Sequence, residues 1–257
     1  MIEPYSDRLH TTGSLLVNAS TLTSLTRSWA AAGYQVNIHA IGDLANRLAI
    51  DAMEAALLDL CPTDSLLRCQ VDSHRFRIEH AQIIHPDDQA RMFHLGIIPS
   101  VQPTHATSDS AYAGLRLGGD RVRAEAYRMR SVWGLGPVLG SDFPVEPADP
   151  FGGIYAAVAR RRPDTGVAGP QPGSGKEGEG EGWCTGEALD LEQALHGFTA
   201  APARGAFLEE VAGAIEKGKW ADWIVLDERL EEMGVDDIRR VRVRETWVGG
   251  RRVFKRE

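Results

Sequence analysis

A regular alternation of strand-like and helix-like segments constrains the fold of this chain more than any other feature of its sequence. Short runs with strand character lie at residues 34–43, 75–82, 97–103 and 137–144. Segments with the apolar spacing or end signals of helices lie at residues 20–32, 44–60, 86–96 and 151–161. A longer segment at 112–136 is expected to be irregular. Strands that alternate with helices favour a parallel sheet with right-handed crossovers, so the sequence predicts an α/β fold.

The composition changes twice along the second half of the chain. Residues 163–186 are rich in Gly, Pro, Glu and Ser, a composition that cannot bury a core and that predicts a disordered insertion. Residues 218–227 and 242–257 are strand-like, and the second run has Gly249–Gly250 between its two halves, which is a hairpin signal. We therefore expect an α/β domain over residues 1–205 and a small β portion over 206–257.

Charge and hydropathy exclude several classes of protein. The formal net charge of −8 and the pI near 5.5 argue against a nucleic-acid partner, because phosphate contacts require clustered Lys and Arg. The one basic run, residues 121–130, interleaves its arginines with Ala, Glu and Met, which predicts a solvated helix face. The N-terminus has no signal-peptide pattern and no apolar run approaches the roughly 20 residues of a membrane span. These observations predict a soluble, cytoplasmic protein without a membrane partner.

The cysteines are few and scattered. Cys61, Cys69 and Cys184 form an odd set without a C-x-x-C pair. This spacing predicts neither a disulfide framework nor a thiolate zinc site. A reducing compartment is the expectation that follows.

Three of the expected strands end in side chains that bind metals. His39 ends the first, His80 the second and Asp142 the fourth. In parallel α/β folds, ligands and catalysis gather at the carboxyl edge of the sheet, so these residues predict a divalent metal site with a free position for water. The metal would lower the pKa of that water, and Asp142 could instead act as a general base. The alternative is that each histidine is a hydrogen-bonded loop residue.

The other histidines carry weaker signals. His105 follows the third strand and is expected on the same edge, where it could bind substrate. His85 lies where capping of the next helix suffices to explain it, and Asp43 has the same capping alternative. The remaining histidines are expected on the surface, on helix faces or in loops: His10, His74, His94 and His196.

Several motifs in series resemble one known family. The motifs HAIGD, RIEHAQ, VQPTH and LGSDFPVEPADPF, followed by GAIEKGKWADWIVLD and VRVRETWVGGRRV, resemble the amidohydrolase superfamily. The group that they resemble most is the amidohydrolase-3, YtcJ-like group with its formamide deformylase-like members. The resemblance covers nearly the whole chain apart from the Gly/Glu-rich segment.

The resemblance implies a fold and a chemistry. It implies a metal-dependent (β/α)8 barrel joined to a small β-sandwich, hydrolysing non-peptide carbon–nitrogen bonds of small amide- or formamide-type substrates. His39 matches the metal ligand that closes barrel strand 5, and His80 matches the strand 6 histidine that binds metal or the reacting oxygen. Asp142 matches the strand 8 aspartate that serves as ligand and proton shuttle. Zinc is the expected metal, and iron or manganese also suits this ligand set.

The sequence departs from the family pattern at its beginning. The family places an H-x-H pair at the end of strand 1, and no two of the eight histidines here are separated by one residue. We therefore expect the C-terminal half of the barrel, strands 5–8, with part of the sandwich. A half barrel exposes strand edges and apolar surface and is prone to self-association. Two alternatives stay open: an inactive remnant or pseudoenzyme that binds a partner, and an unrelated doubly wound binding domain.

Overall fold

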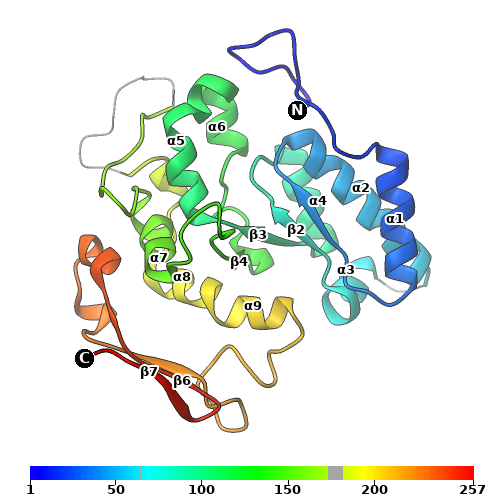
Figure 1. Ribbon diagram of the computed structural model, residues 1–257. Helices are drawn as coiled ribbons and strands as arrows, with labels where there is room; N and C mark the ends of the chain where they lie inside the picture. The colour runs from blue at the N-terminus through cyan, green and yellow to red at the C-terminus, as the bar shows by residue number, and fades with distance from the viewer. Residues whose placement is uncertain (64, 173–181) are drawn as a thin grey trace. The chain divides into compact units, whose positions relative to one another are not determined.

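The computed structural model describes residues 1–63, 65–172 and 182–257 (Figure 1). The chain forms two compact units, which are described separately. Unit 1 comprises Met1–Val101, Asp109–Pro137 and Pro170–Lys176, and unit 2 comprises Gln102–Ser108, Val138–Gly169 and Glu177–Glu257. Helix α5 (Pro103–Leu117) begins in unit 2 and ends in unit 1.

Unit 1 contains parallel strands that are connected by helices. Strand β1 (Asn37–Ala40) pairs with β2 (Arg77–His80), and β2 pairs with β3 (Ile98–Val101), in both cases in parallel. The register sets Ala40 opposite His80. The expectation of an α/β fold with a parallel sheet is confirmed.

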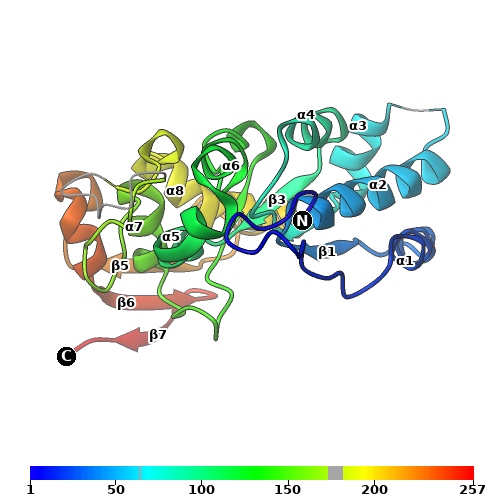
Figure 2. The same ribbon diagram turned by 90° about the horizontal axis from the view of Figure 1, so that it is seen from above.

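The helices of unit 1 follow from the apolar pattern of the sequence. Helix α2 (Asp43–Leu60) buries Ile50, Met53 and Leu57, which recur at helical spacing, and it packs along α1 (Ala19–Ala31), as Figure 2 shows. Helix α4 (Pro86–Leu95) also packs against α2 and is followed by the C-cap Gly96, whose φ of 69° favours glycine. The shorter helical segments of this unit are α3 (Leu66–Cys69), the π-helical turn η1 (Gln70–His74), α6 (Gly119–Glu125) and η2 (Trp133–Leu135).

The segment between the third and fourth strands is more regular than the sequence indicates. Helices α5 and α6 occupy much of residues 112–136, which were expected to be irregular. Helix α5 begins at Pro103, directly after β3, and proline is well suited to the first position of a helix. Within the basic run at 121–130 the helix ends at Glu125, and Tyr127 and Met129 are buried. Only the first half of that run is therefore a helix face.

After the first residues of α5, unit 2 continues with a short strand and three helices. Strand β4 (Val138–Leu139) is followed by α7 (Pro150–Ala159), which is buried along almost its whole length. Helix α8 (Leu191–Phe198) starts with a capping box, and α9 (Ala200–Gly205) follows. Gly197 of α8 lies against Leu139, and a Cβ there would come within 2.5 Å of that side chain. Only glycine allows α8 to approach β4 so closely. A 3-10 turn, η3 (Thr185–Glu187), precedes α8.

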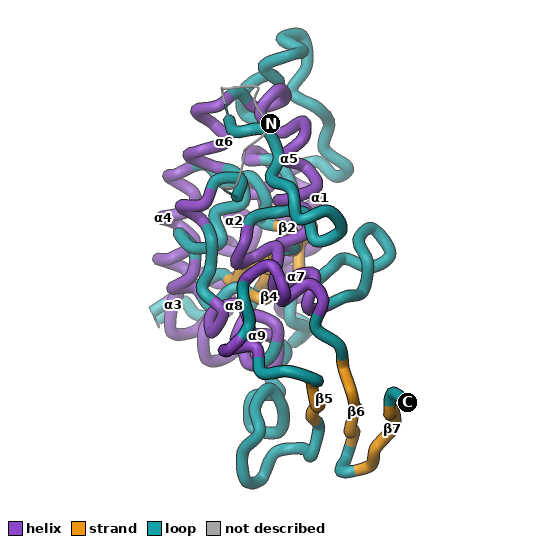
Figure 3. The backbone as a smooth tube through the Cα atoms, turned by 90° about the vertical axis from the view of Figure 1, so that its left-hand side faces the viewer, coloured by secondary structure: helices purple, strands orange, loops and turns teal. Residues whose placement is uncertain are grey.

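The C-terminal residues form an antiparallel sheet (Figure 3). Its strands, in spatial order, are β5 (Trp223–Leu226), β6 (Val243–Val248) and β7 (Arg251–Lys255). Gly249 and Gly250 have φ values of 57° and 73°, as a type I′ hairpin turn requires, which confirms the predicted hairpin. The 3-10 turns η4 (Leu230–Glu232) and η5 (Val235–Arg240) lie between β5 and β6. The Tyr155 hydroxyl on α7 donates to Asp236 of η5 at 3.0 Å. The proposed boundary between residues 205 and 206 stays a prediction.

Part of the predicted insertion at 163–186 is structured. Trp183 is fully buried, and its carbonyl accepts a hydrogen bond of 2.9 Å from Arg160 Nε. Residues 173–181 lie outside the described residues, so disorder in that part stays a prediction.

The cysteine expectation is corrected by the structure. Cys61 and Cys69 are joined by a disulfide, with their Cα atoms 6.4 Å apart. No sequence pattern marks this pair, because it forms only where α2 ends and the chain turns back into α3. Within the described ranges, the chain has no helix of the length and apolarity that crossing a bilayer requires.

Candidate metal and catalytic centre

Unit 1 brings His39 and His80 together. Their ring centroids lie 4.3 Å apart in an edge-to-face arrangement, with the ring planes at 68°. The parallel pairing of β1 and β2 sets the carboxyl ends of the two strands side by side, with Ala40 opposite His80. His80 is buried at 8% exposure, whereas His39 is exposed. Two of the three predicted ligands are therefore neighbours, as the strand-end argument expects.

The face of β1 that carries His39 is polar and exposed. Asn37 and His39 point to one side of β1, and Ile38 and Ala40 are buried on the other. On the neighbouring strand, Arg77 forms an ion pair of 3.0 Å with Glu79, on the partly exposed face of β2. Arg77 and Glu79 were not singled out from the sequence, although the alternation of charged and apolar residues in RFRIE marks them.

The backbone at His80 has an uncommon conformation. His80 and Ala81 have φ values of 74° and 43°, in the left-handed region that residues other than glycine rarely adopt. Such residues persist only where the surroundings fix them, and they concentrate at functional sites. Two residues further on, Ile83 N donates to Ile41 O at 3.0 Å, which holds the chain after the turn.

Asn46 on α2 ties together the segments that follow β1 and β2. Its side chain is fully buried, and Nδ2 lies within 3.2 Å of the carbonyls of Ala40 and Ile41 and 3.0 Å from that of Ile83. One amide group thus contacts the loop after His39 and the loop after His80. Asn46 is a positioning residue that the sequence analysis missed, and its place in the run HAIGDLAN gave no separate signal.

A second group of side chains fixes Gln82, two residues after His80. Gln82 Nε2 donates to Asp109 Oδ2 at 2.8 Å and also contacts the Tyr127 hydroxyl. Both Tyr127 and Tyr112 donate to the Asp109 carboxylate, and Tyr127 N donates to Gln82 O at 2.8 Å. Burial, and then the Asp109 carboxylate, raises the pKa of Tyr127 well above its ordinary value. The phenol therefore stays protonated and acts as a donor.

Unit 2 brings His105 and Asp142 together. His105 lies in the first turn of α5 and is buried, and its Nε2 lies 4.0 Å from Asp142 Oδ2. Asp142 follows β4 and is exposed. Its φ of 56° also lies in the left-handed region. His105 thus lies beside Asp142, and its role in substrate binding stays a prediction.

His85 and Asp43, for which the sequence also allowed a helix-capping role, both lie at the start of a helix. His85 is the N-cap of α4, and its Nδ1 accepts from Asp87 N at 3.3 Å, which confirms the capping interpretation. Asp43 is the first residue of α2 and follows the N-cap Gly42. Its Oδ1 accepts from Leu44 N at 2.7 Å and from Ile2 N at 2.8 Å. Asp43 therefore fastens the N-terminal segment to α2.

Comparison with known proteins places these residues in context. A model of the amidohydrolase family matches residues 1–254. Protein LONG AFTER FAR-RED 3 of Arabidopsis thaliana is 31% identical over 254 residues, which are 98% of this chain and 40% of that protein. Putative amidohydrolase YtcJ of Bacillus subtilis is 28% identical over 255 residues, 99% of this chain and 44% of that protein.

A solved structure agrees with these sequence matches. An uncharacterized metal-dependent hydrolase from Pyrococcus horikoshii superposes with a TM-score of 0.67 at 30% identity, covering 85% of this chain and 39% of that one. The chain thus spans about two fifths of the length of the relatives and of the structure that it matches.

Proposed function

Because the chain belongs to the amidohydrolase family, we propose that it supplies strands five to eight of a metal-dependent (β/α)8 barrel hydrolase. The parallel strands of unit 1 and the share of the relatives that the chain spans support this proposal. Among the described residues of unit 1, β1 pairs with β2 alone, so its outer edge is available to another barrel strand. The exposed, polar face around His39 would then line the barrel interior.

The metal ligands that we propose are His39, His80 and Asp142. One observation carries this assignment: His80 and Asp142 both have left-handed backbone conformations, and each lies beside another ligand-type side chain, His39 and His105 respectively. Two imidazoles and a carboxylate fit a divalent cation with an open coordination position, zinc first. When bound, such a cation supplies Lewis acidity and a nucleophile at neutral pH.

Three side chains carry out the proton transfer, the orientation of the reacting groups and the binding of substrate. Asp142 accepts the proton of the attacking water and returns it to the leaving nitrogen, which its exposed position allows. His80, fixed by its backbone and by the anchored Gln82, holds the reacting oxygen or the cation in one orientation. His105 lies beside Asp142 and is proposed to bind the substrate. The proposed substrate is a small molecule with an amide- or formamide-type carbon–nitrogen bond.

The substitution Asp142→Asn tests this proposal in a protein that contains this chain and the equivalents of the first four barrel strands. The change keeps the shape of the side chain and removes its basicity, so turnover of an amide substrate should fall at least about a hundredfold. Asp120→Asn is the matched control, since Asp120 is fully exposed and pairs with Arg123 of its own helix. Near-normal turnover in Asp142→Asn would contradict the assignment.

Metal content gives a second test. Zinc retained after dialysis should be lost in His39→Ala and His80→Ala but kept in His94→Ala, a change at an exposed histidine of α4. If the unsubstituted protein retained no divalent metal, the interpretation as an inactive relative would replace the enzymatic one.

A further inference from the structure

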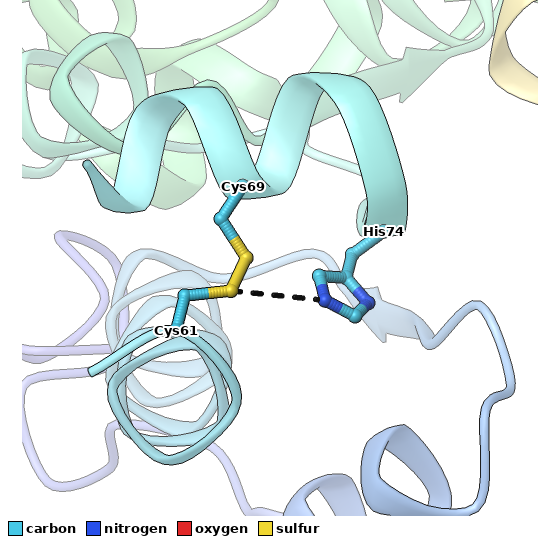
Figure 4. A group of neighbouring side chains, drawn as sticks. All are labelled: Cys61, Cys69 and His74. Carbon is cyan, nitrogen blue, oxygen red and sulfur yellow. Dashed lines mark hydrogen bonds between the residues drawn. A yellow bond between two sulfur atoms is a disulfide. The ribbon is translucent and has the colours of Figure 1, made fainter. Parts of the chain in front are cut away.

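A second group of metal-binding side chains lies in unit 1, around the disulfide (Figure 4). Cys61 caps the end of α2, Cys69 is the last residue of α3, and His74 is the last residue of η1. His74 Nε2 lies 4.0 Å from Cys61 Sγ. One ligand atom from each of the three residues lies within 4.8 Å of the other two.

The π-helical turn explains why His74 meets the cysteines. Arg75 N donates to Gln70 O at 2.7 Å, a hydrogen bond that spans five residues instead of four. In this wider turn, residues that are five apart lie closer to the same side of the helix than they do in an α-helix. His74 therefore lies on the side of Cys69, five residues before it. Turns of this kind are rare and recur at functional sites.

Gln70 fixes that turn from within the core. Its side chain is fully buried, its Nε2 donates to Phe76 O at 3.0 Å, and its Oε1 accepts from Phe76 N at 3.1 Å. The His74 ring lies 5.3 Å from the ring of Phe76, centroid to centroid. The imidazole is thus held by structure that does not depend on the disulfide.

The surroundings suit ligation. His74 is partly buried, and its Nε2 faces Cys61 Sγ, so a ring nitrogen that can bind a metal is already directed at the cysteines. Cys69 is buried, whereas Cys61 and His74 are partly exposed, so reductants and ions can reach the group.

We propose that Cys61, Cys69 and His74 form a zinc site that opens when the disulfide is reduced, separate from the residues assigned to hydrolysis. Two thiolates and one imidazole are ligands that zinc prefers, at about 2.3 Å and 2.0–2.1 Å. A water molecule completes the tetrahedral set. The disulfide and the metal are then alternative cross-links between the end of α2 and the α3–η1 segment.

The reaction that opens the site needs a dithiol reductant. One thiolate of the dithiol attacks a sulfur of the Cys61–Cys69 bond and forms a mixed disulfide. The second thiolate displaces the protein sulfur, so the chain gains two electrons and two protons as two thiols, and the dithiol becomes a cyclic disulfide. Zinc then binds the two thiolates and their two protons are released to solvent.

Alkylation of the unsubstituted chain tests the proposal without any variant. The reduced chain, freed of reductant under argon, is treated with iodoacetamide with and without Zn²⁺, and the rate at each cysteine is followed by peptide mass spectrometry. Zinc should slow alkylation of Cys61 and Cys69 at least about tenfold and leave the rate at Cys184, which lies outside the disulfide, unchanged. Equal rates at Cys61 with and without Zn²⁺ would overturn the proposal.

Cobalt absorption separates this site from the hydrolytic one. Only thiolate ligands give an intense near-ultraviolet charge-transfer band with Co²⁺, and the proposed hydrolytic ligands include no cysteine. The band should appear in the reduced chain and in Cys184→Ser and be absent in the oxidised chain. In Cys61→Ser, which keeps one of the two thiolates, it should fall to about half its intensity or less. His74→Ala should weaken Co²⁺ affinity at least about tenfold, whereas the exposed His94→Ala should not. A band of full strength in Cys61→Ser, or equal affinity in the two histidine variants, would refute the ligand set.

Discussion

Two tyrosines that donate to the same carboxylate allow a buried hydrogen bond to be compared with an exposed one. Tyr127 is 7% exposed and Tyr112 is 49% exposed, and both donate to Asp109. Tyr127→Phe deletes a hydrogen bond to a charged acceptor, whose typical net contribution is about 1.5–3 kcal/mol. Gln82 still donates to the same Asp109 oxygen at 2.8 Å. The carboxylate therefore keeps a partner, and we expect the free energy of unfolding to fall by about 2 kcal/mol.

Tyr112→Phe is the matched control for this measurement. Water replaces the lost hydroxyl at the exposed position, so the expected loss is about 0.5 kcal/mol or less. Both variants are compared with the unsubstituted chain by urea unfolding followed by far-ultraviolet circular dichroism, at equal chain concentration. Equal losses in the two variants would refute the argument that burial sets the strength of these hydrogen bonds.

The same tyrosine gives the chain a dependence on alkaline pH. Because the pKa of Tyr127 is raised in the folded chain, the protonated phenol stabilises the fold fully below about pH 10, the pKa in an unfolded chain. That contribution is lost as the pH rises from there towards the folded pKa. The unsubstituted chain should therefore lose stability more steeply than Tyr127→Phe above about pH 10, and parallel curves would contradict this.

Three further substitutions test the backbone and the buried amide. Asp142→Gly should raise the free energy of unfolding by about 1 kcal/mol, because glycine tolerates the φ of 56°. The same variant should retain less zinc. A loss of stability would contradict the argument that Asp142 has a strained backbone. Asn46→Asp removes the amide donors that face the strand-end carbonyls and buries a carboxylate. Urea unfolding should therefore show a free energy of unfolding that is lower by about 3 kcal/mol or more. A decrease below about 1 kcal/mol would contradict the role given to this amide. In Gly250→Ala the added methyl group has space, since it would lie 3.7 Å from Ala221. The expected decrease in stability, about 1 kcal/mol, therefore comes from the φ of 73° alone. An unchanged thermal unfolding curve would contradict this explanation.

The sequence predicted the parts of the fold that depend on local pattern. Strand β2 appears within the run in which charged and apolar residues alternate, and the Gly249–Gly250 turn joins β6 and β7 as its composition indicates. The neighbourhood of His39 and His80 was also predictable, because parallel strands end at one edge. The register that sets Ala40 opposite His80 was not, since it depends on how the helices pack.

The parts that the sequence did not predict depend on contacts between distant residues. Asp109 and Tyr127 are 27 and 45 residues from Gln82, and no local pattern links them. The first turns of α5 contain Thr, Ala and Ser and lack the apolar residues at helical spacing that predict a helix. Most of these residues are nevertheless buried. The disulfide joins the ends of two helical segments that meet only after the chain folds back.

The stacked tryptophans of the C-terminal sheet give this region its own optical signature. Trp223 on β5 and Trp247 on β6 stack with their ring centroids 5.3 Å apart and their planes 19° from parallel. Indoles this close share their electronic transitions, so the pair should give an exciton couplet in the ultraviolet circular dichroism spectrum that isolated indoles lack. The couplet exists only while β5 and β6 stay paired. A thermal scan at two wavelengths therefore reports whether the sheet melts with the helices or before them, without any added label.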